Sequence, residues 1–255
     1  MHSTPSTPIA LVTGASRGLG KNTALALARQ GTDVIITYHS QAATAHAVVA
    51  EIEALGRRAV ALQLDVGTSS SFAAFAERVS DTLHSWGRMH FDALVNNAGT
   101  GEHAGLMETT EAQFDAMVAI HLKSVFFLTP KLLPLMVDGG RIVNLSSGLT
   151  RFALPGYVAY ASMKGAVEVL TRYMAKELGS RGIAVNVVAP GAIATDFGGG
   201  AVRDNAQLNA VIAGNTALGR VGEPDDIGGV IASLLSPANG WVNAQRIEAS
   251  GGMFL

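Results

Sequence analysis

Short apolar runs alternate with longer segments of helical pattern from residue 9 almost to the end of the chain. The runs that we predict to be strands are 9–13, 33–38, 58–64, 91–97, 141–146, 183–189 and 245–249. The segments that we predict to be helices are 18–30, 41–55, 69–86, 111–136, 156–180 and 224–235. Most of the strand runs are almost entirely apolar, as in strands that are covered on both faces. The alternation therefore predicts an α/β fold, a doubly wound parallel sheet of about seven strands with helices on both faces.

No linker rich in proline or serine divides the chain, so we expect a single domain over residues 9–255. The polar stretch "MHSTPSTP" precedes this domain and predicts a loose tail over residues 1–8. Residues 195–220 break the regular pattern, because they are rich in glycine and asparagine. Long irregular loops in compact domains are usually functional or disordered, so we predict a mobile lid with a short helix there.

The composition narrows the classes of protein. The formal net charge of −2 gives no electrostatic reason to expect binding to nucleic acid or to an anionic membrane. No run approaches the roughly 18 apolar residues of a membrane span, and the N-terminus lacks the pattern of a secretory signal. The chain has no cysteine, and its histidines show no zinc-site spacing, so no metal site is indicated. We expect a soluble cytoplasmic protein.

The first predicted strand runs into the turn "TGASRGLG" (13–20), in which Gly14, Gly18 and Gly20 open a helix. Glycines let the backbone approach a pyrophosphate closely, and the helix N-terminus offers unpaired N–H groups and the positive end of the helix dipole. The same pattern could be a tight turn without a ligand. Its position after the first strand of an alternating fold favours a dinucleotide-binding site.

A tyrosine and a lysine stand one helical turn apart in "YASMK" (160–164). Residues at i and i+4 share a helix face, so the pair is either a structural contact or an acid positioned beside a cation. A nearby ammonium stabilises a phenolate, so Lys164 would lower the pKa of Tyr160 and make its proton easier to exchange. Ser147 ends the fifth predicted strand, at the edge where open α/β sheets bind ligands. Ser146 is expected to point the other way.

These motifs and their order resemble the short-chain dehydrogenase/reductase superfamily, in particular its 3-oxoacyl reductase-like ketoreductases. The resemblance covers essentially the whole chain and rests on the glycine spacing, "NNAG" (96–99), "RIVNLSS", "YASMK", "VAPGAIATD" and "GRVGEPDDIGG". It implies a single-domain Rossmann-type fold and an NADPH-dependent carbonyl reductase that also works in reverse as an alcohol dehydrogenase. In such an enzyme Ser147 would polarise the carbonyl, Tyr160 would donate the proton, and Lys164 would assist Tyr160 and hold the nicotinamide ribose.

The resemblance also implies the cofactor contacts. Asp65 and Val66 would lie against the adenine, Asn96 and Gly99 would line the groove, and residues 190–195 would pass the nicotinamide. The full set of expected cofactor-binding residues is Gly14, Ser16, Arg17, Gly18, Leu19, Gly20, Ser40, Asp65, Val66, Asn97, Ala98, Gly99, Tyr160, Lys164, Pro190, Gly191, Ile193 and Thr195.

The end of the second strand decides between NAD(H) and NADP(H). A carboxylate there would bond the ribose 2′-hydroxyl of NAD(H), whereas a 2′-phosphate needs a cation and no nearby carboxylate. The strand ends in "TYHS" (37–40) without an acid, and Asp33 stands at its start. Arg17 could fork onto the phosphate, and Ser40 could add a hydrogen bond. The sequence therefore favours NADP(H), the alternative being that Arg17 is only solvated.

One position departs from the family pattern. His121, in "AIHLKSVFF" (119–127), stands where the family usually has an asparagine that holds a water and relays protons to the lysine. A neutral histidine can also donate and accept hydrogen bonds, but its ring is larger and it titrates near about pH 6.5. Three alternatives stay open: His121 replaces the asparagine, it only packs at the helix bend, or the enzyme is impaired.

By analogy with the family, Leu154, Tyr157 and Phe197 would wall the substrate pocket, or they would simply pack in the protein. An apolar wall suits a ketone or an acyl chain. Glu102 and His103 either border this pocket or lie in a solvated loop. A free 3-oxo ester, a diketone and other ketones all stay open as substrates, as do stereochemistry and direction.

Reductases of the family that act on carrier-protein thioesters tend to present basic residues beside the site. Arg181 is present, but Asp138 stands where a basic residue is common. This weakens the alternative of a 3-oxoacyl-carrier-protein reductase without removing it.

Family members are usually homotetramers assembled through two long helices, here 111–136 and 156–180, so we expect a homotetramer with a small-molecule carbonyl or alcohol substrate. A non-enzymatic NADPH-binding regulator is an alternative that the departure at His121 keeps open. The complete set of Ser147, Tyr160 and Lys164 argues against it. An epimerase or dehydratase acting on nucleotide sugars is a further alternative, but such relatives carry a larger substrate domain.

Overall fold

The computed structural model describes residues 7–255, so most of the tail predicted over residues 1–8 lies outside the described residues. Seven parallel strands form one sheet in the order β3-β2-β1-β4-β5-β6-β7. Their bounds are β1 Ile9–Val12, β2 Asp33–Tyr38, β3 Ala59–Gln63, β4 Phe91–Asn96, β5 Met136–Leu145, β6 Ala184–Pro190 and β7 Arg246–Ala249. The predicted fold class is confirmed.

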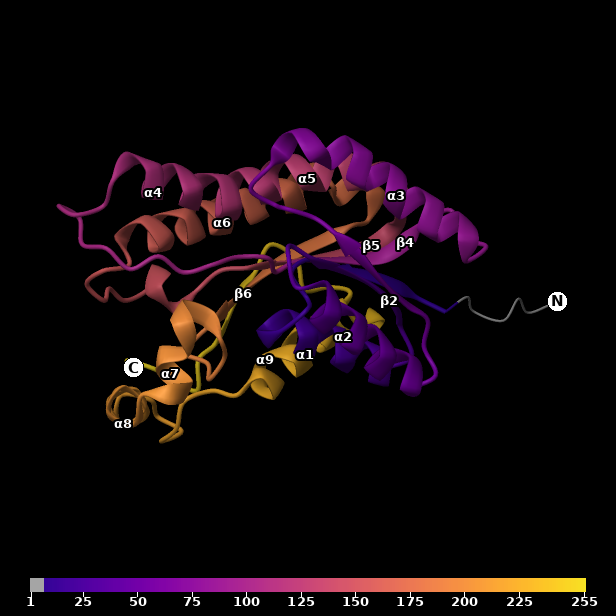
Figure 1. The fold of residues 1–255 in the computed structure, drawn as a ribbon. Coiled ribbons are helices and arrows are strands. Elements are labelled where there is room, and N and C mark those ends of the chain that lie inside the picture. Colours follow the sequence, from indigo (N-terminus) through magenta and orange to yellow (C-terminus); the bar gives the residue numbers. More distant parts are fainter. Residues whose placement is uncertain (1–6) are drawn as a thin grey trace.

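Helices cover both faces of the sheet (Figure 1). Their bounds are α1 Gly18–Arg29, α2 Ala42–Ala54, α3 Phe72–Ser85, α4 Glu111–Met117, α5 Ser124–Leu132, α6 Val158–Glu177, α7 Ala201–Asp204, α8 Ala206–Gly214 and α9 Pro224–Leu235. In Figure 1, α1, α2 and α9 lie on one side of the sheet, and α3, α5 and α6 lie on the other. Val12 and Ile36 enter the first of the two resulting cores, whereas their neighbours Leu11 and Ile35 enter the second. Both faces of each strand are therefore buried, which explains the continuous apolar runs.

The strand order reverses at β1, which has β2 on one side and β4 on the other. In open α/β sheets, ligands bind at such a reversal, beyond the carboxyl ends of the strands. The glycine turn follows β1 and the "NNAG" segment follows β4, so the topology brings both motifs to this point.

The segment 111–136, predicted as one helix, is interrupted. A π turn over Val118–Lys123 separates α4 from α5, and β5 already begins at Met136. Neither glycine nor proline stands in the π turn, so the sequence pattern contains no breaker there. Single π turns inside helices are frequent at functional sites, and this one contains His121.

One stretch of the described chain, Glu111–Leu135, is long and apolar enough to cross a membrane by length and composition alone. Its side chains Leu128 and Leu132 are buried in the second core, against the sheet. Packing in the interior of the domain therefore accounts for part of its apolar composition, whereas Phe126 and Phe127 in the same stretch are exposed.

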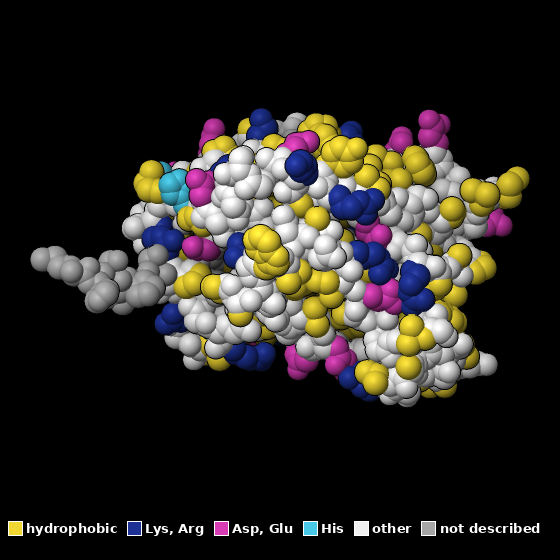
Figure 2. Space-filling view, turned by 180° about the vertical axis from the view of Figure 1, so that it is seen from behind, with side chains coloured by type: hydrophobic (Ala, Val, Ile, Leu, Met, Phe, Trp, Pro, Cys, Tyr) yellow, Lys and Arg dark blue, Asp and Glu magenta, His cyan; other side chains and the backbone are white. Residues whose placement is uncertain are grey.

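The lid segment 195–220 contains more helix than predicted, namely α7 and α8 after a 3₁₀ turn at Phe197–Gly200. Ile212 packs there with Val221 and Met253, which gives the lid a small apolar core of its own. On the surface of the molecule, charged and apolar side chains are mixed. Figure 2 shows dark blue, magenta and yellow side chains interspersed on one face of the molecule, with no large area of a single charge.

Candidate active site

Ser147, Tyr160 and Lys164 meet beyond the carboxyl end of β5. Ser147 caps the short turn that follows the strand, and its Oγ accepts a hydrogen bond from the Leu149 N–H at 3.2 Å. Tyr160 and Lys164 lie on one face of α6, and both are buried. The Ser147 hydroxyl lies close enough to that of Tyr160 to act on its pKa. The structure thus assembles the predicted catalytic set into one buried polar cluster.

Burial is the largest cause of the pKa shifts of Tyr160 and Lys164. It raises the pKa of Tyr160 well above its usual value, and the Ser147 hydroxyl opposes this only in part. The expectation that Lys164 lowers the pKa of Tyr160 stays a prediction, because burial raises this pKa in the structure. Burial also lowers the pKa of Lys164 to about 8. At neutral pH Tyr160 is consequently a protonated phenol, which is the form that a proton donor needs.

The amino group of Lys164 connects the phenol to the sheet. Its Nζ donates to the carbonyl oxygen of Leu145 at 2.8 Å and lies 5.5 Å from the centroid of the Tyr160 ring. Ammonium and phenol are thus close enough for the charge to act on any phenolate that forms during reaction.

His121 is buried in the π turn, next to the same cluster. Its Nε2 lies 2.8 Å from the carbonyl oxygen of Thr100. A carbonyl can only accept, so Nε2 carries the proton, and Nδ1 is an acceptor without a partner among the described residues. Burial, together with the charge of Lys164, lowers the pKa of His121 to about 3. A Cβ at Gly99 would lie 2.8 Å from the ring carbon Cε1, so the imidazole fits because position 99 has no side chain.

The glycine turn is built for close approach of the backbone. Gly14 has a φ of +64°, and a Cβ there would lie 2.7 Å from the Cα of Ala98. Asn97 braces the turn, because its side-chain amide donates to the carbonyl oxygens of Thr13 and Gly14 at 2.8 and 3.1 Å. Gly18 differs, because a Cβ there would meet no atom closer than the Cβ of Thr195, at 3.8 Å. Its φ is +57°. A side chain at Gly18 would project into the space next to Thr195.

A cavity of about 460 Å³ lies between α1 and the lid, lined by Gly18, Lys21, Asn22, Leu25, Ala194, Thr195, Asp196, Arg203, Glu223, Pro224 and Asp225. The N–H groups at the start of α1 offer a partial positive charge there. Arg17 precedes α1, and its exposed guanidinium lies 3.9 Å from the carboxylate of Asp196. The bare glycine, the helix N-terminus and the cation together fit the phosphates of a dinucleotide.

A second cavity of about 280 Å³ opens at the ends of β2 and β3, lined by His39, Gln63, Leu64, Asp65, Thr68, Ser71 and Arg78. Asp65 accepts hydrogen bonds from the Thr68 hydroxyl at 2.8 Å and the Gly67 N–H at 2.9 Å, which lower the pKa of its carboxyl. His39 lies close enough to lower it further. The sequence interpretation overlooked His39, although "TYHS" places it directly after β2.

Several other expected cofactor residues do not line either of these two cavities. Ser16 is buried within the glycine turn, and Leu19 and Val66 pack against the cores. Ser40 is exposed after β2. Pro190 is the last residue of β6, and from there Gly191 and Ile193 lead the chain to Thr195.

Asn96 does not line the groove, which corrects the expectation from the sequence. Its side-chain amide is buried and donates to Asn144 Oδ1 at 2.8 Å and to Thr129 Oγ1 at 3.2 Å. Because it is the last residue of β4, its side chain alternates with that of Asn97 and enters the opposite face of the sheet.

Aromatic side chains lie against the phenol of Tyr160 and near it. The ring of Phe197 packs on Tyr160 with the centroids 5.6 Å apart, and a Cβ at Gly101 would lie 2.9 Å from the ring of Phe197. His103 and Tyr157 form an edge-to-face pair 5.1 Å apart. Leu154 is partly exposed at 38 %.

Comparisons with known proteins agree with this geometry. Residues 14–254 match a short-chain dehydrogenase family model described as "Enoyl-(Acyl carrier protein) reductase". The 3-oxoacyl-[acyl-carrier-protein] reductase of Synechocystis sp. is 38 % identical, over 97 % of this chain and 97 % of its own. The promiscuous reductase LugOII, which catalyses keto-reduction at C1 during lugdunomycin biosynthesis, is 40 % identical, with a TM-score of 0.93 over 99 % of this chain and 100 % of its own.

A further solved structure contains a bound nucleotide and a second bound molecule. The landomycin C-6 ketoreductase LanV, with bound NADP and rabelomycin, is 38 % identical, with a TM-score of 0.88 over 97 % of this chain and 96 % of its own. The relatives share the whole length of the chain, its fold and a reductase activity. The chain belongs to the short-chain dehydrogenase/reductase superfamily.

Proposed function

We propose that this NADP(H)-dependent carbonyl reductase acts on the ketone of a planar aromatic substrate, with Tyr160 as the proton donor. The observation that carries the proposal is the placement of Phe197 against Tyr160, with the ring centroids 5.6 Å apart, beside the Ser147 hydroxyl. A flat ring system can stack on the Phe197 ring while its carbonyl oxygen meets both hydroxyls.

The side chains divide the work of reduction. Bound NADPH supplies a hydride to the carbonyl carbon. The hydroxyls of Ser147 and Tyr160 donate to the carbonyl oxygen, where negative charge develops, and Tyr160 then transfers its proton to that oxygen. Lys164 stabilises the phenolate that remains, because its ammonium lies beside the ring.

We assign to His121 the place of the asparagine that the family usually has there. Its unpartnered Nδ1 can accept a hydrogen bond from a water next to Lys164, and its low pKa keeps the ring neutral and able to accept. This supports replacement of the asparagine, and packing at the bend accompanies it.

The preference for NADP(H) is supported by the charges at the adenosine end. Arg17 before α1 and His39 after β2 stand near this end, and "TYHS" supplies no carboxylate that would repel a 2′-phosphate. Arg17 can leave its weak, exposed contact with Asp196 for a phosphate at little energetic cost.

Two classes of substrate are candidates, an aromatic ketone and a 3-oxoacyl thioester. LugOII is named for keto-reduction during lugdunomycin biosynthesis, and LanV is a landomycin C-6 ketoreductase with bound rabelomycin. We take these two relatives to favour an aromatic ketone. The Synechocystis relative favours a 3-oxoacyl thioester on a carrier protein. Arg181 is the basic residue that could help to dock a carrier protein, but it forms an ion pair with Asp138 at 2.7 Å. It also precedes β6, at the end of the sheet opposite to Ser147. This geometry favours the aromatic ketone.

Exposed apolar side chains on α5 and α6 support assembly of the protein into an oligomer. Phe126 and Phe127 on α5 are 51 % and 47 % exposed, and Val169 and Tyr173 on α6 are 45 % and 64 % exposed. Exposed large apolar side chains of this kind are typical of a subunit interface. We therefore propose a cytoplasmic homotetramer assembled through these helices.

The test of the substrate class compares rabelomycin and 2-tetralone with ethyl acetoacetate and the N-acetylcysteamine thioester of acetoacetate, each with NADPH and with NADH. We expect kcat/KM with the two aromatic ketones to exceed that with the thioester by at least about ten-fold, the gain of one well-packed aromatic contact. A preference for the thioester would instead support the carrier-protein candidate.

A further inference from the structure

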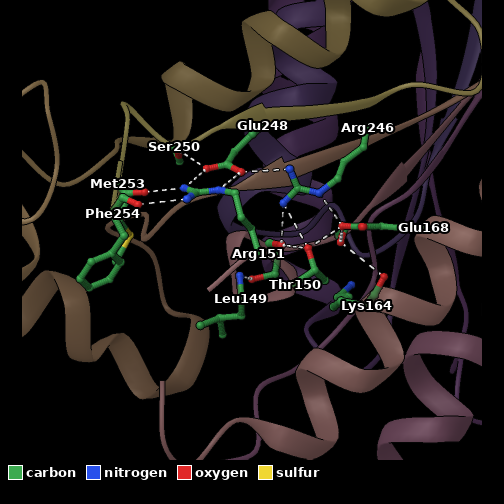
Figure 3. Close-up of polar contacts among 12 residues, drawn as sticks. Leu149, Thr150, Arg151, Lys164, Glu168, Arg246, Glu248, Ser250, Met253 and Phe254 are labelled. Atoms are coloured by element: carbon green, nitrogen blue, oxygen red, sulfur yellow. Dashed lines mark hydrogen bonds and ion pairs between the residues drawn. The ribbon is translucent and has the colours of Figure 1, made fainter. Parts of the chain in front are cut away.

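A partly buried network of charged side chains lies behind the Ser147 loop, and the proposed catalytic roles do not account for it. Glu168 is its centre, one helical turn after Lys164 on α6 (Figure 3). Its Oε1 accepts hydrogen bonds from the hydroxyls of Ser146 and Thr150, each at 2.6 Å, and from Arg246 Nε at 2.8 Å. The Glu168 side chain is only 14 % exposed.

Side chains of the network contact the Ser147 carbonyl oxygen and the preceding residue, Ser146. Thr150 Oγ1 also lies 2.9 Å from the carbonyl oxygen of Ser147, so its one proton is shared between this oxygen and Glu168 Oε1. Arg246 Nη2 lies 3.5 Å from the same carbonyl oxygen. Ser146, the preceding residue, is bonded to Glu168 and lies 3.4 Å from the Lys164 carbonyl oxygen. The loop that carries Ser147 is therefore tied to the same helix that carries Tyr160 and Lys164.

The charges balance along the network, which extends to the C-terminal segment. Arg246 Nη1 donates to Glu248 at 2.9 Å, and Arg151 Nη2 donates to the other oxygen of Glu248 at 2.6 Å. Arg151 also donates to the carbonyl oxygens of Met253 and Phe254 at 2.5 and 3.0 Å. Two carboxylates alternate with two guanidiniums, so no buried charge is left without an opposite partner.

We propose that Glu168, together with Arg246, is a positioning residue for ketone reduction: it holds the Ser147 loop against α6, so that the hydroxyls of Ser147 and Tyr160 converge on one carbonyl oxygen. The inference rests on the proposed function. Catalysis depends steeply on such geometry, because a displacement of about 1 Å can cost about a hundred-fold in rate. A network with a merely structural role would hold the fold together equally well without acting through Ser147.

The test is a double-mutant cycle with Ser147→Ala. Thr150→Val removes the hydroxyl that joins Glu168 to the Ser147 carbonyl and keeps the shape of the side chain. Glu168→Gln keeps an oxygen acceptor and removes the charge that faces Arg246. We expect either change to lower kcat for 2-tetralone about ten-fold and to leave the KM for NADPH within about two-fold. In the Ser147→Ala background the same changes should alter kcat less than about two-fold.

A matched control lies at the opposite end of the sheet. Asp33 is buried and paired with Arg58 at 2.7 Å, and Asp33→Asn should lower the melting temperature without lowering kcat. Equal fractional losses of kcat with and without Ser147 would overturn the positioning role, as would a loss of kcat in Asp33→Asn that matches that of Glu168→Gln. A folded wild-type protein that reduces no ketone would contradict the proposed function itself, and this inference with it.

Discussion

The imidazole of His121 stands edge-on against the phenol of Tyr160, with the ring centroids 5.1 Å apart and the ring planes at 89°. One nitrogen of the imidazole is fixed by the carbonyl of Thr100, and the other is a buried acceptor without a partner among the described residues. A helix bend thus presents a neutral histidine to the catalytic phenol, at the position where the family usually has an asparagine.

Replacement of His121 separates the hydrogen-bonding role from packing. His121→Ala removes the acceptor and should lower kcat for ketone reduction at least about ten-fold, whereas His121→Asn restores a donor and an acceptor and should lose less than about three-fold. Steady-state kinetics at saturating NADPH measure both values. Equal rates in the wild type and both variants would show that the histidine only packs at the bend.

The buried histidine also predicts how stability depends on pH. The pKa of His121 falls from 6.5 to about 3 on folding, so the unfolded chain binds more protons between these two pH values. Stability must therefore decrease as the pH falls below about 6.5, by about 2 kcal/mol at pH ~5. Urea unfolding of the wild type and His121→Asn at neutral pH and at pH ~5 measures this, and the wild type should lose about 2 kcal/mol more than the variant. Equal losses would contradict a neutral His121.

Arg17 should carry the selectivity for NADP(H). Arg17→Ser removes the cation at the glycine turn and should raise the KM for NADPH at least about ten-fold, with the KM for NADH within about two-fold. Arg29→Ser is the control, because Arg29 is an exposed arginine at the other end of α1. Equal changes for the two nucleotides, or in the two variants, would remove Arg17 from the 2′-phosphate site.

Phe197 should select aromatic substrates. Phe197→Ala removes the ring that packs on Tyr160 and should raise the KM for 2-tetralone about ten-fold, while the KM for ethyl acetoacetate changes less than about three-fold. Leu208→Ala, on α8 of the same lid, controls for changes in lid stability. A similar rise in KM for both ketones would mean that Phe197 closes the site without reading the substrate.

The sheet was predictable from the sequence because burial on both faces produces continuous apolar strands such as 33–38 and 183–189. The π turn at Val118–Lys123 was not, because its residues differ little in pattern from an ordinary helix. The helices α7 and α8 of the lid could not be predicted from the sequence for another reason. Their glycines and asparagines indicate a loop, whereas the packing of Ile212 with Met253 comes from distant parts of the chain.

The candidate site shows the same division. Short motifs with fixed spacing, such as "YASMK", indicated residues that the fold then brings together. The pKa of Tyr160 could not be judged from its spacing to Lys164 along the helix, because burial, a tertiary property, is the largest cause of its shift. Glu168 and Arg246 are 78 residues apart, so their pairing has no local signature beyond the position of Glu168 one turn after Lys164.

The central claim is that the phenol of Tyr160 protonates a ketone that NADPH reduces, and Tyr160→Phe tests it most directly. Loss of NADPH absorbance with 2-tetralone gives turnover, and titration of NADPH fluorescence gives the Kd of the same samples. The account predicts that the variant binds NADPH within about two-fold of the wild type and loses about a thousand-fold in kcat. Turnover by Tyr160→Phe at the wild-type rate would contradict it.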